Sequence, residues 1–188
     1  GPMLAELVSP DQWDAFEAAH DLDFACQFEQ VGRFRGNYFV QEHGVAAVFR
    51  AIPERIHTAE ELGLPDVVTG LADLEAGLVL VTGPTGSGKS TTLAAIIDRV
   101  NTRHARHIVT IEDPVEFVHD NRRSVVSQRE VGTDTRSFEA ALRSAVRQDA
   151  DVVLVGELRD LETIALAINA SSMGVLVFGT LHTASAAK

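Results

Sequence analysis

The sequence predicts an α/β protein, with a mostly parallel β-sheet covered on both faces by helices, preceded by a small α+β unit. From residue 77 onward, near-continuous apolar runs alternate with segments whose apolar residues recur every three or four positions. This pattern is typical of buried parallel strands connected by amphipathic helices. Before residue 54, short runs that alternate apolar and polar residues flank turn residues, which favours antiparallel strands.

The composition is that of an ordinary globular protein. The chain has 188 residues, of which 45% are apolar and 23% charged, and this balance excludes disorder and collagen-like repeats. No apolar run approaches the roughly 20 residues of a membrane helix, and no signal peptide is visible. The single cysteine, Cys26, cannot form an intrachain disulfide, which fits a reducing compartment. We therefore expect a cytoplasmic protein with no direct membrane insertion.

Charge is distributed unevenly along the chain. The formal net charge is −11, with 4 basic and 14 acidic residues in 1–75 against 12 and 13 in 76–188. An acidic first part argues against a nucleic-acid partner, because non-specific binding depends on neutralising phosphates. Fourteen of the basic residues are arginines, and the one internal lysine, Lys89, lies in a glycine-rich segment.

Four segments are expected. Residues 1–3 resemble a cloning remnant followed by a start methionine, residues 4–53 form the α+β unit, 54–57 form a linker, and 58–188 form the α/β core. In the first unit, Ser9-Pro10-Asp11-Gln12 predicts a helix start with a capping box. Strands are expected around Phe24–Phe28, at 33–40 and at 45–52.

The second unit is expected to begin with two helices. A capping box at Thr58–Glu61 predicts a short helix, and Pro65 predicts the start of another that runs to Gly77. Apolar runs then predict strands at 78–81, 108–111, 124–127, 152–155 and 175–178. Helical periodicity falls between several of these runs, at 93–100, 138–145 and 161–168.

A phosphate-binding loop of the pattern G-x-x-x-x-G-K-[ST] is predicted at Gly83-Pro84-Thr85-Gly86-Ser87-Gly88-Lys89-Ser90. It lies between a predicted strand and a predicted helix, which is the context that the motif requires. Backbone N–H groups and the helix N-terminus would face phosphate oxygens. We expect Lys89 to bridge the β- and γ-phosphates of a nucleotide and the Ser90 hydroxyl to ligate Mg²⁺.

Acidic residues follow two of the predicted strands. Glu157 follows the run 152–155 after Gly156, where it could hold Mg²⁺ through water; the alternative is a solvated acid at a strand end. Glu112, Asp113 and Glu116 follow the run 108–111. These three carboxylates indicate metal positioning and a general base for water, or else an acidic loop that faces solvent.

Taken together, these motifs resemble the type II and type IV secretion ATPase superfamily, and within it the PilT-type ATPases of type IV pilus retraction (twitching motility). The resemblance is carried by the phosphate-binding loop and by residues 110–117, 128–132, 156–163 and 178–183. Residues 31–53 resemble the end of the N-terminal PAS-like domain of that family. The resemblance implies a RecA-like P-loop NTPase core, incomplete at its C-terminus, after a partial PAS-like α+β domain.

The resemblance also implies roles for single residues near the nucleotide. Glu116 corresponds to a catalytic glutamate, Glu157 to the Walker B glutamate, and His182 to a histidine near the γ-phosphate. Arg35 and Arg50 correspond to arginines that reach a nucleotide across domains or subunits. From the residues alone, His182 could instead be a core histidine, and the two arginines could lie on an exposed strand face.

Arg143 and Arg147 correspond to positions thought to sense nucleotide. Their spacing of four from Glu139 also fits a surface ladder of ion pairs. Two departures from the family pattern remain: Gly174 is followed by Val175 instead of a histidine, and the chain ends at Lys188, so we expect a truncated core.

The function implied by the resemblance is that of an ATP-hydrolysing, Mg²⁺-dependent hexameric motor that powers pilus retraction. Its partners would be further copies of itself and a platform protein of the pilus at the inner membrane, where it would be bound peripherally. One alternative is a pilus-extension or type II secretion ATPase. Another, motivated by Val175, is a nucleotide-binding regulator with weak turnover. A nucleic-acid motor is disfavoured by the acidic charge.

Overall fold

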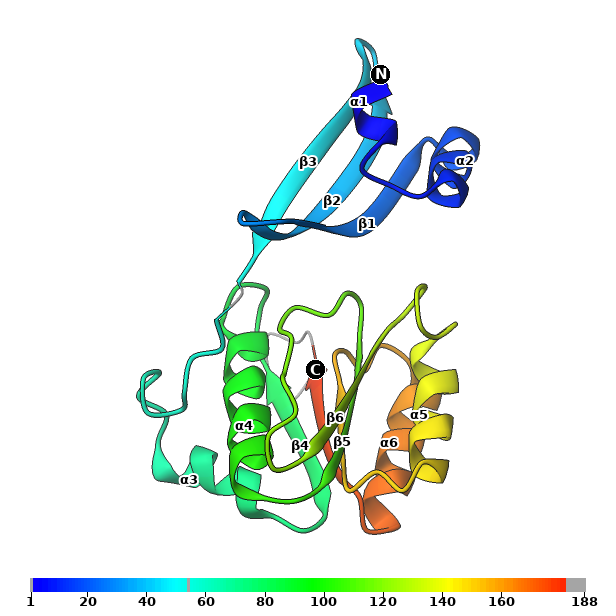
Figure 1. The fold of residues 1–188 in the computed structure, drawn as a ribbon. Coiled ribbons are helices and arrows are strands. Elements are labelled where there is room, and N and C mark those ends of the chain that lie inside the picture. Colours follow the sequence, from blue (N-terminus) through cyan, green and yellow to red (C-terminus); the bar gives the residue numbers. More distant parts are fainter. Residues whose placement is uncertain (1, 54, 182–188) are drawn as a thin grey trace. The chain divides into compact units, whose positions relative to one another are not determined.

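The computed structural model describes residues 2–53 and 55–181, and it divides the chain into two compact units, Gly1–Glu54 and Arg55–Lys188. Each unit has its own sheet (Figure 1). Among the residues described, none of the helices combines the length and the apolar character that crossing a bilayer requires.

Unit 1 is a three-stranded antiparallel sheet with the strand order β1-β2-β3. Its helix α2 begins as predicted, because the Ser9 hydroxyl accepts from the Gln12 N–H at 3.2 Å and Gln12 Oε1 accepts from the Ser9 N–H at 2.9 Å. The elements are α1 (Pro2–Ala5), α2 (Pro10–Ala19), β1 (Asp21–Phe28), β2 (Gly32–Gln41) and β3 (Gly44–Ile52).

The core of unit 1 is aromatic and lies on one face of this sheet. Phe16, Phe24 and Tyr38 are buried together, and the Tyr38 hydroxyl donates to the Leu4 carbonyl at 2.8 Å. The Phe24 ring covers Gly36 so closely that a Cβ there would lie 2.4 Å from a ring carbon. Side chains alternate along a strand, so the residues between these point to the other face.

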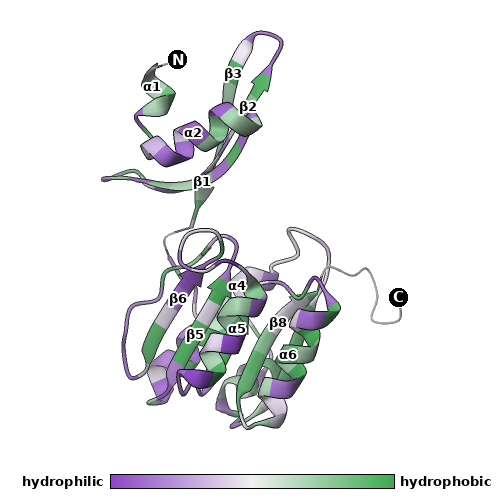
Figure 2. Cartoon of the chain, turned by 90° about the vertical axis from the view of Figure 1, so that its right-hand side faces the viewer, coloured by the Kyte–Doolittle hydropathy of each residue, from purple (hydrophilic) through white to green (hydrophobic). Residues whose placement is uncertain are grey.

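Unit 2 has a five-stranded parallel sheet with the order β4-β8-β7-β5-β6, which confirms the predicted architecture. Apolar stretches run along β5 and β8 (Figure 2). The elements are α3 (Asp66–Thr69), the 3₁₀ helix η1 (Gly70–Asp73), β4 (Gly77–Thr82), α4 (Lys89–Arg103), β5 (His107–Glu112), β6 (Val125–Glu130), α5 (Phe138–Arg147), β7 (Val152–Val155), α6 (Leu161–Ser172) and β8 (Leu176–Leu181).

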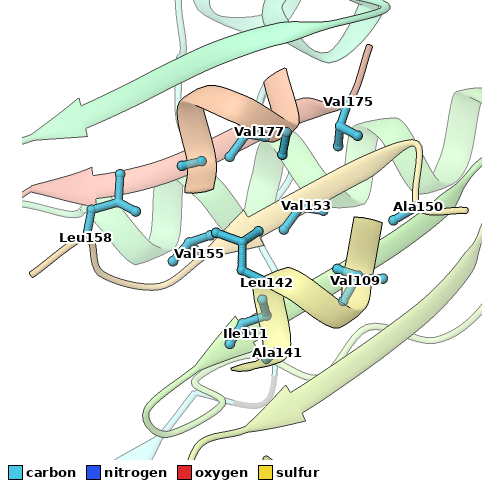
Figure 3. Close-up of a cluster of buried hydrophobic side chains, with 13 residues drawn as sticks. Val109, Ile111, Ala141, Leu142, Ala150, Val153, Val155, Leu158, Val175 and Val177 are labelled. Carbon is cyan, nitrogen blue, oxygen red and sulfur yellow. The ribbon is translucent and has the colours of Figure 1, made fainter. Parts of the chain in front are cut away.

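Helices cover both faces of the sheet. On β5, Ile108 packs with α4 and η1, whereas Val109 and Ile111 pack with α5 and α6; the second cluster is drawn in Figure 3. Neighbouring residues on β7 divide in the same way, with Val152 on the α4 face and Val153 on the other. Residues of even number on β5 and β7 therefore face α4, and this parity determines which side chains approach the phosphate-binding loop.

Two predicted helices at the start of unit 2 are wrong in extent. The capping box at Thr58 forms with the Glu61 side chain and N–H, both at 3.1 Å, but the segment is a single turn. Gly63, with φ of +63°, closes it at once, because the N–H groups of Gly63 and Leu64 turn back to Glu60 and Ala59. The helix after Pro65 ends as α-helix at Thr69 and continues only as η1 to Asp73.

Candidate functional site

The glycine-rich loop joins β4 to α4 at the carboxyl edge of the sheet. Gly86 and Gly88 have φ values of +79° and +89°, a conformation that glycine adopts without strain. Lys89 is only 8% exposed, and its Nζ donates to the carbonyl oxygens of Gly83 at 2.9 Å and Pro84 at 3.0 Å. The loop therefore holds a buried ammonium group against its own backbone.

Helix α4 begins directly at this loop. Its N-cap is Gly88, and no side chain caps the helix. The first N–H groups of an α-helix lack partners within the helix. The N-terminus of α4 therefore presents N–H donors and the positive end of the helix dipole beside Lys89, an arrangement suited to phosphate oxygens.

The end of β7 is held between its two neighbours. The Gly156 N–H donates to the Ile111 carbonyl of β5 at 2.8 Å, and the Leu158 N–H donates to the Thr180 carbonyl of β8 at 3.0 Å. A Cβ at Gly156 would lie 3.3 Å from Glu112 Cα, so the two strands approach closely there. Glu157 stands between these anchored residues, and its Oε2 accepts from Arg159 Nε at 2.5 Å.

A small cavity of about 30 Å³ lies between the start of α4 and the ends of the strands. Glu112, Leu154 and Gly156 are all among its lining residues. They have even numbers, and the even-numbered positions of β5 and β7 are those that face α4. Its nine lining residues are Ser90, Leu93, Ala94, Glu112, Phe117, His119, Leu154, Gly156 and Thr180. Ser90, the serine expected to bind metal, and the Glu112 carboxyl group of β5 thus border one cavity.

The three clustered carboxylates have different environments. Burial raises the pKa of Glu112 above its usual range, against hydrogen bonds that lower it, the shortest being from Thr110 Oγ1 at 2.7 Å. Glu116 is exposed and its N–H lies 3.4 Å from Glu112 Oε2. Asp113 lies 4.0 Å from Arg159 at the surface. Sequence spacing alone treats the three alike, whereas strand parity singles out Glu112.

The predicted arginines lie in three places. Arg35 and Arg50 are directly opposed on β2 and β3 of unit 1, on the face away from its aromatic core. Arg143 on α5 pairs with Glu139 at 3.0 Å, the ion pair anticipated on this helix face, and also with Glu162 of α6 at 2.8 Å. Arg147 is exposed.

The two positions at which the family pattern has a histidine, 175 and 182, differ in what the structure describes. His182 lies outside the described residues. Val175 is buried in the core beneath α6 and precedes β8 at its amino end, where its carbonyl accepts from the Gly77 N–H at 3.2 Å. The phosphate-binding loop follows the opposite, carboxyl end of the neighbouring strand β4, about 20 Å away for a strand of this length.

One functional candidate, His119, was not singled out from the sequence. It is 8% exposed and borders the cavity, and its N–H donates to Gln128 Oε1 at 2.7 Å. A signal was present, because Val115, Phe117 and His119 alternate with exposed residues and are all buried. The third buried position of this alternation therefore marks a buried imidazole.

We expect His119 to make the folded state sensitive to acid. Burial lowers its pKa from 6.5 to about 4; smaller effects come from Asp98 and Asp120, which raise the pKa, and Arg122, which lowers it. The unfolded chain therefore binds a proton between pH 6.5 and 4 that the folded chain does not, and stability falls as the pH is lowered through this window. At pH 5 the loss relative to pH 8 should be about 2 kcal/mol.

Urea unfolding at pH 8 and pH 5 measures this contribution. In His119→Asn, which cannot take up the proton, the difference in unfolding free energy between the two pH values should be smaller by about 2 kcal/mol. An unchanged difference in the variant would show that His119 is protonated with equal ease in both states.

The residues at this edge fit a nucleotide with Mg²⁺. Among residues 2–53 and 55–181, no group of three or more His, Cys, Asp or Glu side chains could hold a metal ion. Magnesium is commonly bound through substrate phosphates, one or two protein oxygens and water, and a hydroxyl with nearby carboxylates suits that mode. The phosphates would supply most of the metal ligands.

Comparisons with known proteins agree with this geometry. The chain is 54% identical over 186 residues to the type IV pilus retraction ATPase PilT of Pseudomonas aeruginosa, covering 99% of this chain and 54% of that protein. It is 50% identical over 188 residues to a twitching motility protein of Neisseria gonorrhoeae, covering 100% of this chain and 50% of that protein.

A solved structure of the pilus retraction motor PilT with bound ADP is also similar. Its TM-score is 0.94 at 50% identity, over 97% of this chain and 53% of that one. The chain thus spans about half the length of the relatives that it matches. The family model described as type II/IV secretion system protein matches residues 33–188. The chain therefore belongs to the type II/IV secretion system protein family.

Proposed function

We propose that the chain is the nucleotide-binding part of an ATP-hydrolysing motor that powers type IV pilus retraction. The observation that carries the proposal is the buried Lys89 folded onto the phosphate-binding loop at the uncapped start of α4, next to Ser90, which lines one cavity together with Glu112 of β5. Its similarity to PilT, including a structure with bound ADP, supports ATP as the nucleotide and retraction as the work.

In this proposal the loop residues bind and orient the phosphates. Backbone N–H groups of Gly83–Gly88 and of the first turn of α4 contact the phosphate oxygens. Lys89 leaves the two loop carbonyls and bridges the β- and γ-phosphates. Ser90 donates an oxygen ligand to Mg²⁺, and Glu157 contacts the metal through water. The metal ion, when bound, neutralises charge on the phosphates.

Hydrolysis requires a base and further positive charge. We assign to Glu116 the orientation and deprotonation of the attacking water, because it is an exposed carboxylate whose N–H lies 3.4 Å from Oε2 of the cavity-lining Glu112. Arg35 and Arg50 supply charge to the transferring phosphoryl group from unit 1 of the same or a neighbouring copy. By the same resemblance, we assign to His182 a role at the γ-phosphate and to Arg143 and Arg147 a role in sensing the nucleotide.

The assembly is part of the same proposal. Residues 4–53 form a PAS-like domain, 54–57 a hinge and 58–188 a RecA-like core, and six copies form a ring in the cytoplasm. The ring binds peripherally to a platform protein of the pilus at the inner membrane. Movement of unit 1 about the hinge couples hydrolysis to mechanical work.

Phosphate release from ATP with and without Mg²⁺ tests the activity. We expect Mg²⁺-dependent turnover and no stimulation by DNA or RNA. Binding of nucleotide without turnover would favour a regulator, and stimulation by nucleic acid would favour a nucleic-acid motor.

Restoration of twitching in a strain that lacks its retraction ATPase tests the direction of work. Restoration of pilus assembly or of type II secretion instead would assign the chain to the extension or secretion ATPases.

A further inference from the structure

The buried imidazole of His119 is the polar group that the contacts above leave unexplained. Its Nδ1 is buried, and the described part of the chain offers it no hydrogen-bond partner. Buried polar atoms in native proteins are nearly always hydrogen-bonded to protein or to ordered water, since an unmet one costs free energy. Val115 and Phe117 occupy the two preceding buried positions, so an apolar side chain would suit the same alternation.

The cavity beside His119 has polar side chains in its lining and is large enough for water. Its volume of about 30 Å³ exceeds the roughly 10–15 Å³ that one water molecule requires. Ser90, Glu112 and Thr180, whose side chains carry oxygen atoms, are among its lining residues. A water there would find the two to four polar partners that buried waters have.

The Glu112 carboxylate can accept a further hydrogen bond from such a water. Its Oε1 accepts from Thr110 at 2.7 Å and from Gln128 at 3.4 Å, and its Oε2 lies 3.4 Å from the Glu116 N–H. A carboxylate has about four acceptor positions. The same Gln128 accepts from the His119 N–H, so the backbone of His119 is fixed relative to Glu112 while its ring borders the cavity.

We propose that His119 Nδ1 and the Glu112 carboxyl hold an ordered water molecule beneath Ser90, and that this water orients the Ser90 hydroxyl toward Mg²⁺. The inference rests on the proposed function, because it concerns how this chain binds a magnesium-nucleotide complex. A serine that offers a lone pair to the metal must direct its hydrogen elsewhere, and an acceptor on the cavity side supplies that direction. His119 is thus a positioning residue that acts through water and Ser90.

Calorimetric titration of the chain with a non-hydrolysable ATP analogue, with Mg²⁺ or with EDTA, tests the proposal. The informative variants are His119→Leu, which fills the space without a polar atom, and His119→Asn, which retains a polar group near the position of Nδ1. Removal of residues that orient metal ligands typically lowers metal affinity 10–100-fold. In His119→Leu we expect the gain in affinity from Mg²⁺ to fall about tenfold, with affinity in EDTA unchanged. His119→Asn should retain most of the gain.

His107→Ala is the matched control. Its ring also lies in unit 2, on the other end of β5, and contacts the Gln148 carbonyl at 3.1 Å and Ser127 Oγ at 3.0 Å. Removal of this ring should lower the free energy of unfolding without changing the gain in nucleotide affinity from Mg²⁺. A full Mg²⁺ effect in His119→Leu, or an equal loss in His107→Ala, overturns the inference.

A high-resolution crystal structure of the wild-type chain provides a second measurement if His119→Leu fails to fold. A water within hydrogen-bond distance of both Nδ1 and Glu112 supports the proposal, and its absence there overturns it. If the wild-type chain binds no nucleotide in either condition, the proposed function fails and the inference fails with it. Binding that is insensitive to His119 removes the inference alone.

Discussion

Replacement of Lys89 by alanine is expected to lower the affinity of the chain for ATP about 100-fold or more. Hydrogen bonds from a charged donor contribute about 1.5–3 kcal/mol each, and the ammonium group would make two of them to phosphate oxygens. Part of this gain is offset, since Lys89 must first leave the carbonyl oxygens of Gly83 and Pro84. The net loss is therefore smaller than the sum of two such bonds.

Arg99→Ala is the matched control for the loss of one positive charge from the same helix. Arg99 pairs with Glu60 at 2.6 Å, away from the loop, so its variant should bind nucleotide within about twofold of the wild type. Calorimetry gives the affinities, and circular dichroism shows that both variants are folded. If Lys89→Ala bound as tightly as Arg99→Ala, the loop would not be the phosphate site.

The sequence predicted those parts of the fold whose signal is local and repeated. The strands of unit 2 are continuous apolar runs, and a segment buried on both faces has little alternative to a central strand. The helix at Thr58 failed because its capping box is real but Gly63 follows immediately, so the start signal precedes a stop signal by five residues. After Pro65 the α-helix gives way to η1 at Gly70.

The candidate site was predictable in outline only. A motif identifies Lys89 and Ser90 without reference to packing, whereas the ranking of Glu112, Asp113 and Glu116 depends on which face of β5 each follows. Which face each residue of β5 follows is known only once the structure places Ile108 and Val109 on opposite faces of the sheet. The sequence also could not predict the second ion-pair partner of Arg143, because the pair with Glu162 forms only if α6 lies beside α5.

The position of Val175 bears on the regulator alternative. That alternative was motivated by the valine at position 175, where the family pattern has a histidine. The residue lies in the core at the amino end of β8, whereas the phosphate-binding loop leaves the carboxyl edge of the sheet. The substitution therefore changes packing far from Lys89, and the observation that favoured weak turnover no longer points to the site.

Glu116→Gln should lower the rate of ATP hydrolysis about 100- to 10,000-fold, the range that loss of a general base produces. Binding of the Mg²⁺–nucleotide complex should change little, because Glu116 is exposed and its replacement by a neutral amide of the same shape disturbs no buried contact. Phosphate release at saturating ATP gives the rate, and calorimetry gives the affinity. Asp113→Asn, which removes a neighbouring exposed carboxylate, is the control and should hydrolyse at a rate close to the wild type.

Glu112→Gln separates the two glutamates that the sequence presents together. Glu112 accepts hydrogen bonds from Thr110 and Gln128 inside the cavity, so its replacement should weaken the gain in nucleotide affinity from Mg²⁺ before it affects the chemical step. The two variants thus predict opposite patterns: slow turnover with intact binding for Glu116→Gln, and impaired metal-dependent binding for Glu112→Gln. If Glu116→Gln hydrolysed ATP normally and Glu112→Gln bound it normally but did not turn it over, the base would be the buried carboxyl group. Its raised pKa would then favour it as the group that exchanges a proton with water near neutral pH.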